Sequence, residues 1–185
     1  MTRLSRKPAF WAVATVLVVG LVFGLYWFQP WKLLTSKTVN DAAPAVVSAP
    51  ASPVPTPSPV AGSASPSAVA VLVAEGRLVT HEHDSSGTAQ LVRLPDGRYQ
   101  VILRDLATSD GPDLRVWLTD QPVLPGRAGW HVFDDGKHVE LGRLKGTHGT
   151  QVYAVPSGVD PATLRSVTIW CARFKVSFAA APLAA

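Results

Sequence analysis

The chain is poor in sulfur, with one cysteine, Cys171, and one methionine, Met1, among 185 residues. A lone cysteine cannot form an intramolecular disulfide, so Cys171 is a buried packing residue, an intermolecular link or a reactive group. No histidine or methionine follows it, which disfavours a cupredoxin-type copper site. The absence of a Cys-x-x-Cys-His motif excludes ordinary c-type haem attachment.

A charge excess of one sign is also missing from most of the chain. From Val71 onward, twelve Lys and Arg residues face twelve Asp and Glu residues, so the formal net charge of +4 comes from the N-terminal part. Nucleic-acid binding depends on clustered positive charge that neutralises phosphates. We therefore expect no nucleic-acid partner.

Residues 9–28 contain no charge and no proline, and as a helix they are long enough to cross a hydrocarbon core of about 30 Å. We interpret this run as a transmembrane helix; the alternative is a cleaved signal peptide, although the run exceeds the usual length of such a segment. Basic residues precede the span and follow it, with a small excess before it: Arg3, Arg6 and Lys7 against Lys32 and Lys37. The positive-inside rule then predicts a single-pass protein of the cell membrane, with residues 1–8 in the cytoplasm and the remainder extracytoplasmic. The lipid bilayer is the first predicted partner. No cysteine directly follows the span to carry a lipid.

Residues 29–70 read as a juxtamembrane segment and a linker. Between Asp41 and Ser67, Pro, Ala and Ser occupy 20 of 27 positions, seven of them prolines. Such tracts favour extended polyproline conformations of about 3.1 Å per residue, so this one could hold a domain about 80 Å from the bilayer.

Residues 71–185 read as an extracytoplasmic β domain. Short alternating segments are separated by turn residues such as Asp96-Gly97, a strong hairpin signal. We predict an all-β fold, an antiparallel β-sandwich or barrel of about eight strands. The expected strands are 75–81, 88–94, 98–106, 113–119, 131–133, 139–144, 151–155 and 165–178.

Four blocks in this region occur in a characteristic order: residues 83–89, 111–118, 144–153 and 167–178. Together they resemble the electron-transfer DM thirteen domain, the extracellular β module of Skeletor-type proteins that also occurs beside DOMON and b-type cytochrome modules. The resemblance covers most of residues 75–183. It implies a β-sandwich-like fold and a redox or electron-transfer role for the single cysteine, which matches Cys171. It names no substrate.

The residues around Cys171 allow two geometries. In a straight strand the thiol would share a face with Arg173 and Lys175, and nearby cations lower a thiol pKa and make the cysteine reactive. However, the apolar positions change parity after Cys171, from Ile169 to Phe174, which indicates a bulge or bend. With a bend, Cys171 stays on the buried face and behaves as a small hydrophobe.

We therefore predict an accessory redox or electron-transfer role centred on Cys171, tuned by Trp170, Arg173 or Lys175, with a redox or envelope protein as partner. Asp113 and Lys145 lie in turn sequences and are secondary candidates for ligand contacts. No motif supports a metal or haem, and the five histidines give only a weak metal signal, so the cofactor stays unassigned. We do not expect a self-contained enzyme. The alternative is a non-catalytic binding or adhesion module in which Cys171 packs in the core.

Overall fold

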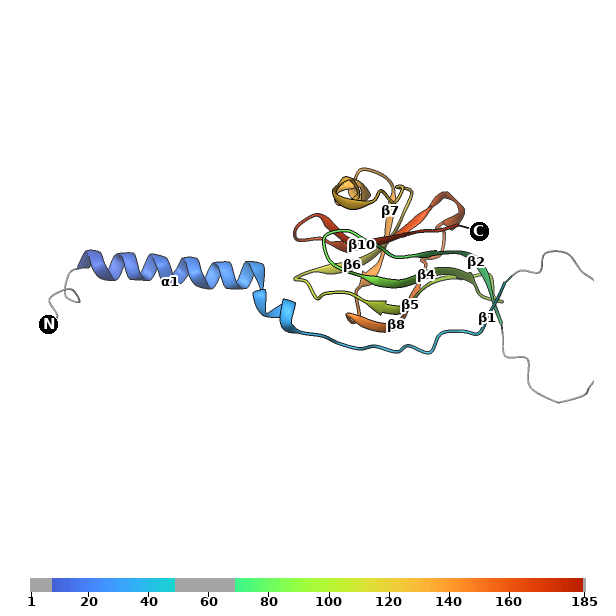
Figure 1. The fold of residues 1–185 in the computed structure, drawn as a ribbon, viewed down its shortest axis with the longest axis horizontal. Helices are drawn as coiled ribbons and strands as arrows, with labels where there is room; N and C mark the ends of the chain where they lie inside the picture. Colours follow the sequence, from blue (N-terminus) through green and yellow to red (C-terminus); the bar gives the residue numbers. More distant parts are fainter. Residues whose placement is uncertain (1–7, 49–68, 185) are drawn as a thin grey trace, which may run out of the picture.

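The computed structural model describes residues 8–48 and 69–184. One long helix, α1 (Pro8–Phe28), points away from a two-layered β-sandwich, as Figure 1 shows. A short 3-10 turn, η2 (Pro30–Leu34), joins the helix to the sandwich. From Pro8 to Lys32 the chain is long and apolar enough to cross a membrane, and none of it is buried in the protein.

Each layer of the sandwich is a five-stranded sheet. The first contains, in spatial order, β1 (Val46–Ser48), β2 (Ala70–Arg77), β4 (Ser86–Arg93), β5 (Tyr99–Ala107) and β8 (His148–Ala154). The second contains β3 (Val79–Thr80), β10 (Val176–Pro182), β9 (Ser166–Cys171), β6 (Leu114–Thr119) and β7 (His138–Arg143). All pairings are antiparallel except that of β1 with β2. The all-β sandwich prediction is confirmed.

Three expected strands differ from the structure. The expected strand 75–81 covers the end of β2 and all of β3, which lie in different sheets. The long strand over 165–178 is a hairpin, in which β9 and β10 are joined by a four-residue turn, 172–175. The expected strand 131–133 is mostly a 3-10 turn, η4 (Val132–Asp134), within a long connection that also contains η3 (Gly126–Gly129). This connection covers the outer face of the second sheet, where Phe133 is fully buried against Trp117 and Trp170.

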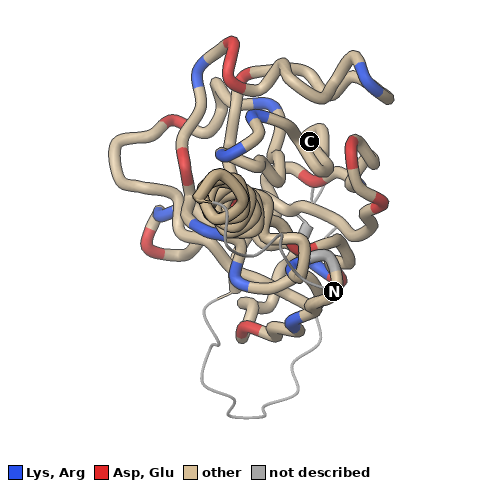
Figure 2. The backbone as a smooth tube through the Cα atoms, turned by 90° about the vertical axis from the view of Figure 1, so that its left-hand side faces the viewer, with Lys and Arg blue, Asp and Glu red and all other residues tan. Residues whose placement is uncertain are grey.

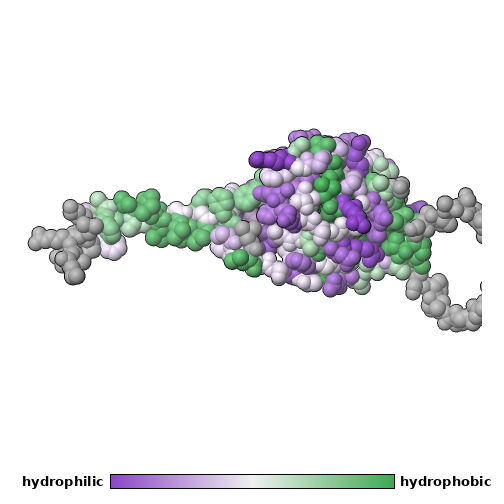
Figure 3. All heavy atoms as spheres, viewed as in Figure 1, coloured by the Kyte–Doolittle hydropathy of each residue, from purple (hydrophilic) through white to green (hydrophobic). Residues whose placement is uncertain are grey.

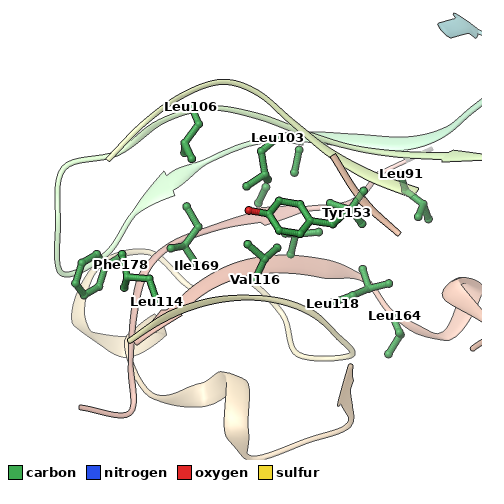
Figure 4. Packing of buried hydrophobic residues seen from close by; sticks show 14 of the residues in the cluster. Leu91, Leu103, Leu106, Leu114, Val116, Leu118, Tyr153, Leu164, Ile169 and Phe178 are labelled. Carbon is green, nitrogen blue, oxygen red and sulfur yellow. The ribbon is translucent and has the colours of Figure 1, made fainter. Parts of the chain in front are cut away.

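The core lies between the two sheets (Figure 4). Alternate residues of each strand point into it, as the period of two in the sequence predicted. β6 and β9 supply one side through Leu114, Val116, Leu118, Val167 and Ile169, and the opposite sheet supplies Leu91, Val101, Leu103 and Tyr153. Every residue of β9 is buried, because its other face is covered by the long connection.

The segment before the Pro/Ala/Ser-rich tract lies on the sandwich over its described length. Residues 37–41 run beside β8, where Val39 N–H donates to the carbonyl of His148 at 2.8 Å and Asp41 N–H donates to that of Thr150 at 2.8 Å. Residues 43 and 46 then pack on the outer face of the first sheet, and β1 pairs with β2. Figure 1 shows this path as a blue-to-cyan trace below β8.

The predicted linker therefore connects two neighbouring strands. Its central part, residues 49–68, lies outside the described residues. Val46 pairs with Ala70 and Ser48 with Leu72, so the two ends of the tract meet at the same sheet edge. In the described residues the chain already contacts the sandwich at Lys32 and at residues 37–41, before the central part of the tract.

Candidate functional site

Cys171 lies at the end of the sandwich nearest α1. It is the last residue of β9, and its cross-strand neighbours are Leu114 on β6 and Val176 on β10. Its side chain is fully buried and belongs to the inter-sheet core. Burial raises the pKa of the thiol, while backbone N–H groups of the adjoining turn, those of Phe174 and Arg173, act in the opposite direction. The geometry matches the bent alternative, with the thiol on the buried face.

Arg173 and Lys175 lie in the turn after Cys171. Lys175 has a left-handed backbone (φ 52°), and its carbonyl accepts a hydrogen bond from His131 Nδ1 at 2.7 Å. Arg173 Nη1 donates to the carbonyl oxygens of Tyr26 and Trp27, at 3.3 and 2.7 Å, and its guanidinium lies 5.3 Å from the Trp27 ring centroid. Arg173 therefore bonds the C-terminal end of α1, where carbonyls lack helical partners.

Phe174 adds a second contact between the turn and the helix. Its ring stacks on that of Phe28, with centroids 5.8 Å apart. Lys32 Nζ donates to the carbonyl of Gly111 at 3.0 Å, and Thr35 Oγ1 donates to Asp110 at 2.9 Å. The sandwich is thus held directly at the end of α1. In Figure 2, which looks along the helix, Lys and Arg positions and Asp and Glu positions are both spread over the sandwich around it.

Trp170 lies on the opposite face of β9 from the thiol. It is buried and stacks on Trp117 with centroids 5.0 Å apart, and Trp117 stacks on His138 at 4.0 Å. Trp117 Nε1 lies 3.4 Å from Glu140 Oε2. The stacked rings of Trp170, Trp117 and His138 therefore extend from beneath the long connection to the exposed His138. Trp170 is therefore next to Cys171 in sequence but not in the same packed layer.

Asp113 and Lys145 are each held by an ion pair. Asp113 accepts bonds from Arg115 Nε and Nη2 at 3.0 and 3.2 Å, and its main-chain carbonyl accepts one from Ala172 N–H at 2.9 Å. Lys145 Nζ bonds Asp41 Oδ2 at 2.5 Å and lies 5.0 Å from the Tyr153 ring centroid. Both residues line a polar cavity of about 210 Å³, together with Lys37, Arg143 and Gly146. Trp170, Arg173 and Lys175 are absent from its lining.

A second cavity lies between α1 and the sandwich, and sequence reasoning missed it. Its volume is about 310 Å³ and its lining is mostly apolar. The walls are Phe28, Pro30, Pro112, Phe174 and Phe178, with Gln29, Lys32, Glu82, His83, Asp110 and Gly111 completing them. The His83 and Phe178 rings lie 4.0 Å apart. Residues 83 and 111–112 fall in blocks that carried the family resemblance, but nothing in the sequence indicates that they meet the end of α1.

The histidines do not converge. His81 is buried on the outer side of the second sheet, with Nδ1 2.8 Å from Ser177 Oγ and Nε2 3.0 Å from the carbonyl of Leu124. His83 faces the second cavity. Within residues 8–48 and 69–184, no group of three His, Cys, Asp or Glu side chains could hold a metal ion.

The fold and this arrangement define a class of protein, a β-sandwich module carried at the end of an apolar N-terminal helix. Residues 77–183 match the family described as "Electron transfer DM13". The match covers more than half of the chain, from the end of β2 to the segment after β10, and the protein belongs to this family. No curated protein and no solved structure matches the chain. The association with Skeletor-type and DOMON proteins stays a prediction.

Proposed function

We propose that the protein is a membrane-anchored, extracytoplasmic electron-transfer accessory that works at the bilayer surface. Family membership supports the electron-transfer role. The length and composition of α1 support the anchor, and the basic residues before the span favour a cytoplasmic N-terminus. The observation that carries the proposal is the contact of Arg173 and Phe174 with the end of α1, because with α1 in a bilayer this contact would keep the turn after Cys171 near the membrane surface.

Within this proposal Cys171 is the candidate redox residue. Its fully buried side chain has a raised pKa, so it is not suited to nucleophilic attack on a large substrate. The thiol would instead give one electron, through packed neighbours, and its proton to an oxidised partner protein at the helix-proximal end, and would take both back when it is reduced again. Trp170, Arg173 and Lys175 are proposed to influence its potential, and Asp113 and Lys145 to contact a ligand in the polar cavity.

A second candidate function is a non-catalytic binding or adhesion module. The complete burial of Cys171 among the aliphatic residues of the core favours it, because a small apolar side chain would fill the same place. In that case the sandwich would present a surface to an envelope partner without transferring electrons.

One experiment separates the two functions. The full-length chain, purified in lipid nanodiscs, is titrated electrochemically beside the Cys171→Ser variant. The electron-transfer role predicts a reversible midpoint potential that shifts or disappears in the variant. The Val116→Ala variant, which removes core volume on a neighbouring strand but leaves the thiol, should keep the potential. A chain without any reversible signal, in both wild type and variants, supports the binding module.

A further inference from the structure

The cavity between α1 and the sandwich has the features of a binding site for a small molecule dissolved in the bilayer. It is enclosed by two parts of the chain far apart in sequence, the helix end at Phe28–Lys32 and the loops at 82–83 and 110–112. The contacts of Arg173, Lys32 and Thr35 hold these parts together. Its volume of about 310 Å³ is at the small end of the range for ligand pockets, which suits one ring system.

The position of the cavity favours an occupant that comes from the membrane. Phe28 is the last residue of the apolar helix, and Tyr26, Trp27 and Trp31 have the aromatic character typical of the boundary between hydrocarbon and water. Figure 3 shows the apolar surface of the helix continuing up to the sandwich at this point. A molecule carried in the bilayer would meet the cavity without crossing water.

The chemistry of the walls narrows the class of ligand. Phe28, Phe174 and Phe178 offer ring faces, against which a flat ring can stack. The charged groups are Lys32, Glu82 and Asp110, and Lys32 is already engaged by the Gly111 carbonyl and lies 3.9 Å from Asp110 Oδ1. With two carboxylates against one ammonium, an anionic headgroup is disfavoured. The site fits a neutral, flat molecule.

His83 supplies the polar recognition. Its ring lies against Phe178, and its Nε2 is 3.7 Å from Glu82 Oε2. Within the part of the chain that the structure describes, Glu82 is the one polar neighbour of this imidazole, and 3.7 Å is too long for a hydrogen bond, so the single N–H of the neutral ring, whichever nitrogen carries it, can donate to a ligand carbonyl. A purely hydrocarbon occupant, such as an acyl chain, would offer the His83 N–H no acceptor in the cavity, whereas a ligand carbonyl would accept from it.

We propose that this cavity binds the ring of a lipid-soluble quinone, with His83 donating a hydrogen bond to one carbonyl and the phenylalanines stacking on the ring. The proposal rests on the proposed function in that α1 must span a bilayer. Phe178 forms part of the cavity wall and also belongs to the core cluster that contains Cys171. A quinone here would therefore be separated from the core around Cys171 by one aromatic side chain.

The test uses the full-length chain in phosphatidylcholine nanodiscs and a photoreactive azido derivative of a short-chain benzoquinone. Labelling should be saturable, should be displaced by unmodified decylubiquinone, and should fall on peptides containing His83 or the 172–178 segment. In His83→Leu the displacement constant should weaken about five- to tenfold, as expected for one lost hydrogen bond. The matched control, His138→Leu, changes an exposed histidine outside the cavity and should bind as the wild type does.

A second variant separates a loss of quinone binding from a loss of the fold. Phe174 is 38% exposed, so Phe174→Ala should leave the sandwich folded while it removes one wall of the cavity and weakens quinone binding. Non-saturable labelling, equal binding in His83→Leu, or equal displacement by decylbenzene, which has no carbonyl, would overturn the proposal. Binding is measured without electron transfer. Quinone binding without any redox signal would therefore contradict the proposed electron-transfer function but not the quinone site. A redox signal without quinone binding would contradict the quinone site but not the electron-transfer function.

Discussion

Arg173 Nη1 lies 2.7 Å from the carbonyl oxygen of Trp27, across the C-terminal end of α1. These two residues are 146 positions apart in the chain. The last carbonyls of a helix have no intrahelical donors and carry partial negative charge, so a guanidinium is a suitable partner for them. The contact joins the turn next to Cys171 to the apolar helix, and it fixes how the sandwich sits on the end of that helix.

Replacement of Arg173 by Ala should loosen the joint between helix and sandwich without unfolding the sandwich. The turn is at the surface, so we expect a change in unfolding free energy of less than about 1 kcal/mol. The measurement is a distance distribution between spin labels at positions 17 and 127, which should broaden in the variant. Because labelling uses introduced cysteines, the buried Cys171 can stay in place. Arg98→Ala, which removes an exposed arginine paired with Asp96, should leave the distribution narrow. An unchanged distribution in Arg173→Ala would contradict this role.

The Cys171 thiol should be almost inert in the folded protein. Its side chain is fully buried and burial raises its pKa, so the thiolate fraction at pH 8 is small and the sulfur is inaccessible. Alkylation by iodoacetamide, followed by mass spectrometry, should be slow in buffer and complete in denaturant. The same burial predicts no disulfide-linked dimer on a non-reducing gel of the native full-length protein. Rapid alkylation below pH 8 would show that the turn at 172–175 opens readily.

The all-β fold could be predicted from the sequence because alternation is local: the inward residues of β5 and β6 appear as every second residue. The hairpin β9–β10 could not, because β9 is buried on both faces and its sequence does not alternate. The turn was indicated in the sequence by the apolar positions, which change from odd to even residue numbers after Cys171. A bend was inferred from this change, but not a reversal of the chain.

The candidate site depends on contacts that are distant in sequence. Phe28 meets Phe174, and Lys32 meets Gly111, although each segment alone reads as an ordinary helix end or turn. The path of residues 37–48 over the first sheet was also unpredictable, since proline and alanine carry no period that marks a strand. Gly146 and Gly149 are local signs of this approach, because a β-carbon at either position would meet residues 37–40.

Gly149 should be essential for the docking of residues 37–41. Its φ is 94°, and a β-carbon there would lie 2.3 Å from the Val39 carbonyl oxygen. Gly149→Ala should therefore displace the segment and cost about 1–3 kcal/mol of unfolding free energy. Hydrogen exchange should increase at the amides of Val39 and Asp41, which now donate to β8. Gly158→Ala is the control: its φ of 89° carries similar strain, but nothing lies near its β-carbon position. Equal exchange in both variants would mean that strain alone, not the close approach, is responsible.

His81 should make the protein less stable in mild acid. Desolvation lowers its pKa in the folded state, while the unfolded chain keeps a value of about 6.5. As pH falls below that value, the unfolded state binds a proton that the folded state does not, so the unfolding free energy decreases, by at most about 1.4 kcal/mol per pH unit for one group. Above pH 7.5 neither state is protonated and the effect vanishes.

The structural reason for this pH dependence is the environment of the His81 ring. Nδ1 pairs with Ser177 Oγ and Nε2 with the Leu124 carbonyl, while the ring stacks on Phe133 at 5.8 Å. The neutral ring accepts from Ser177 and donates to Leu124, whereas a protonated ring would have to donate to both. Denaturant unfolding at pH 7.5, 6.5 and 5.5 should show a decline in the wild type that is reduced in His81→Gln, which cannot titrate. His138→Gln, at an exposed histidine, should keep the wild-type decline. A decline of the same size in His81→Gln would assign the acid sensitivity to another group.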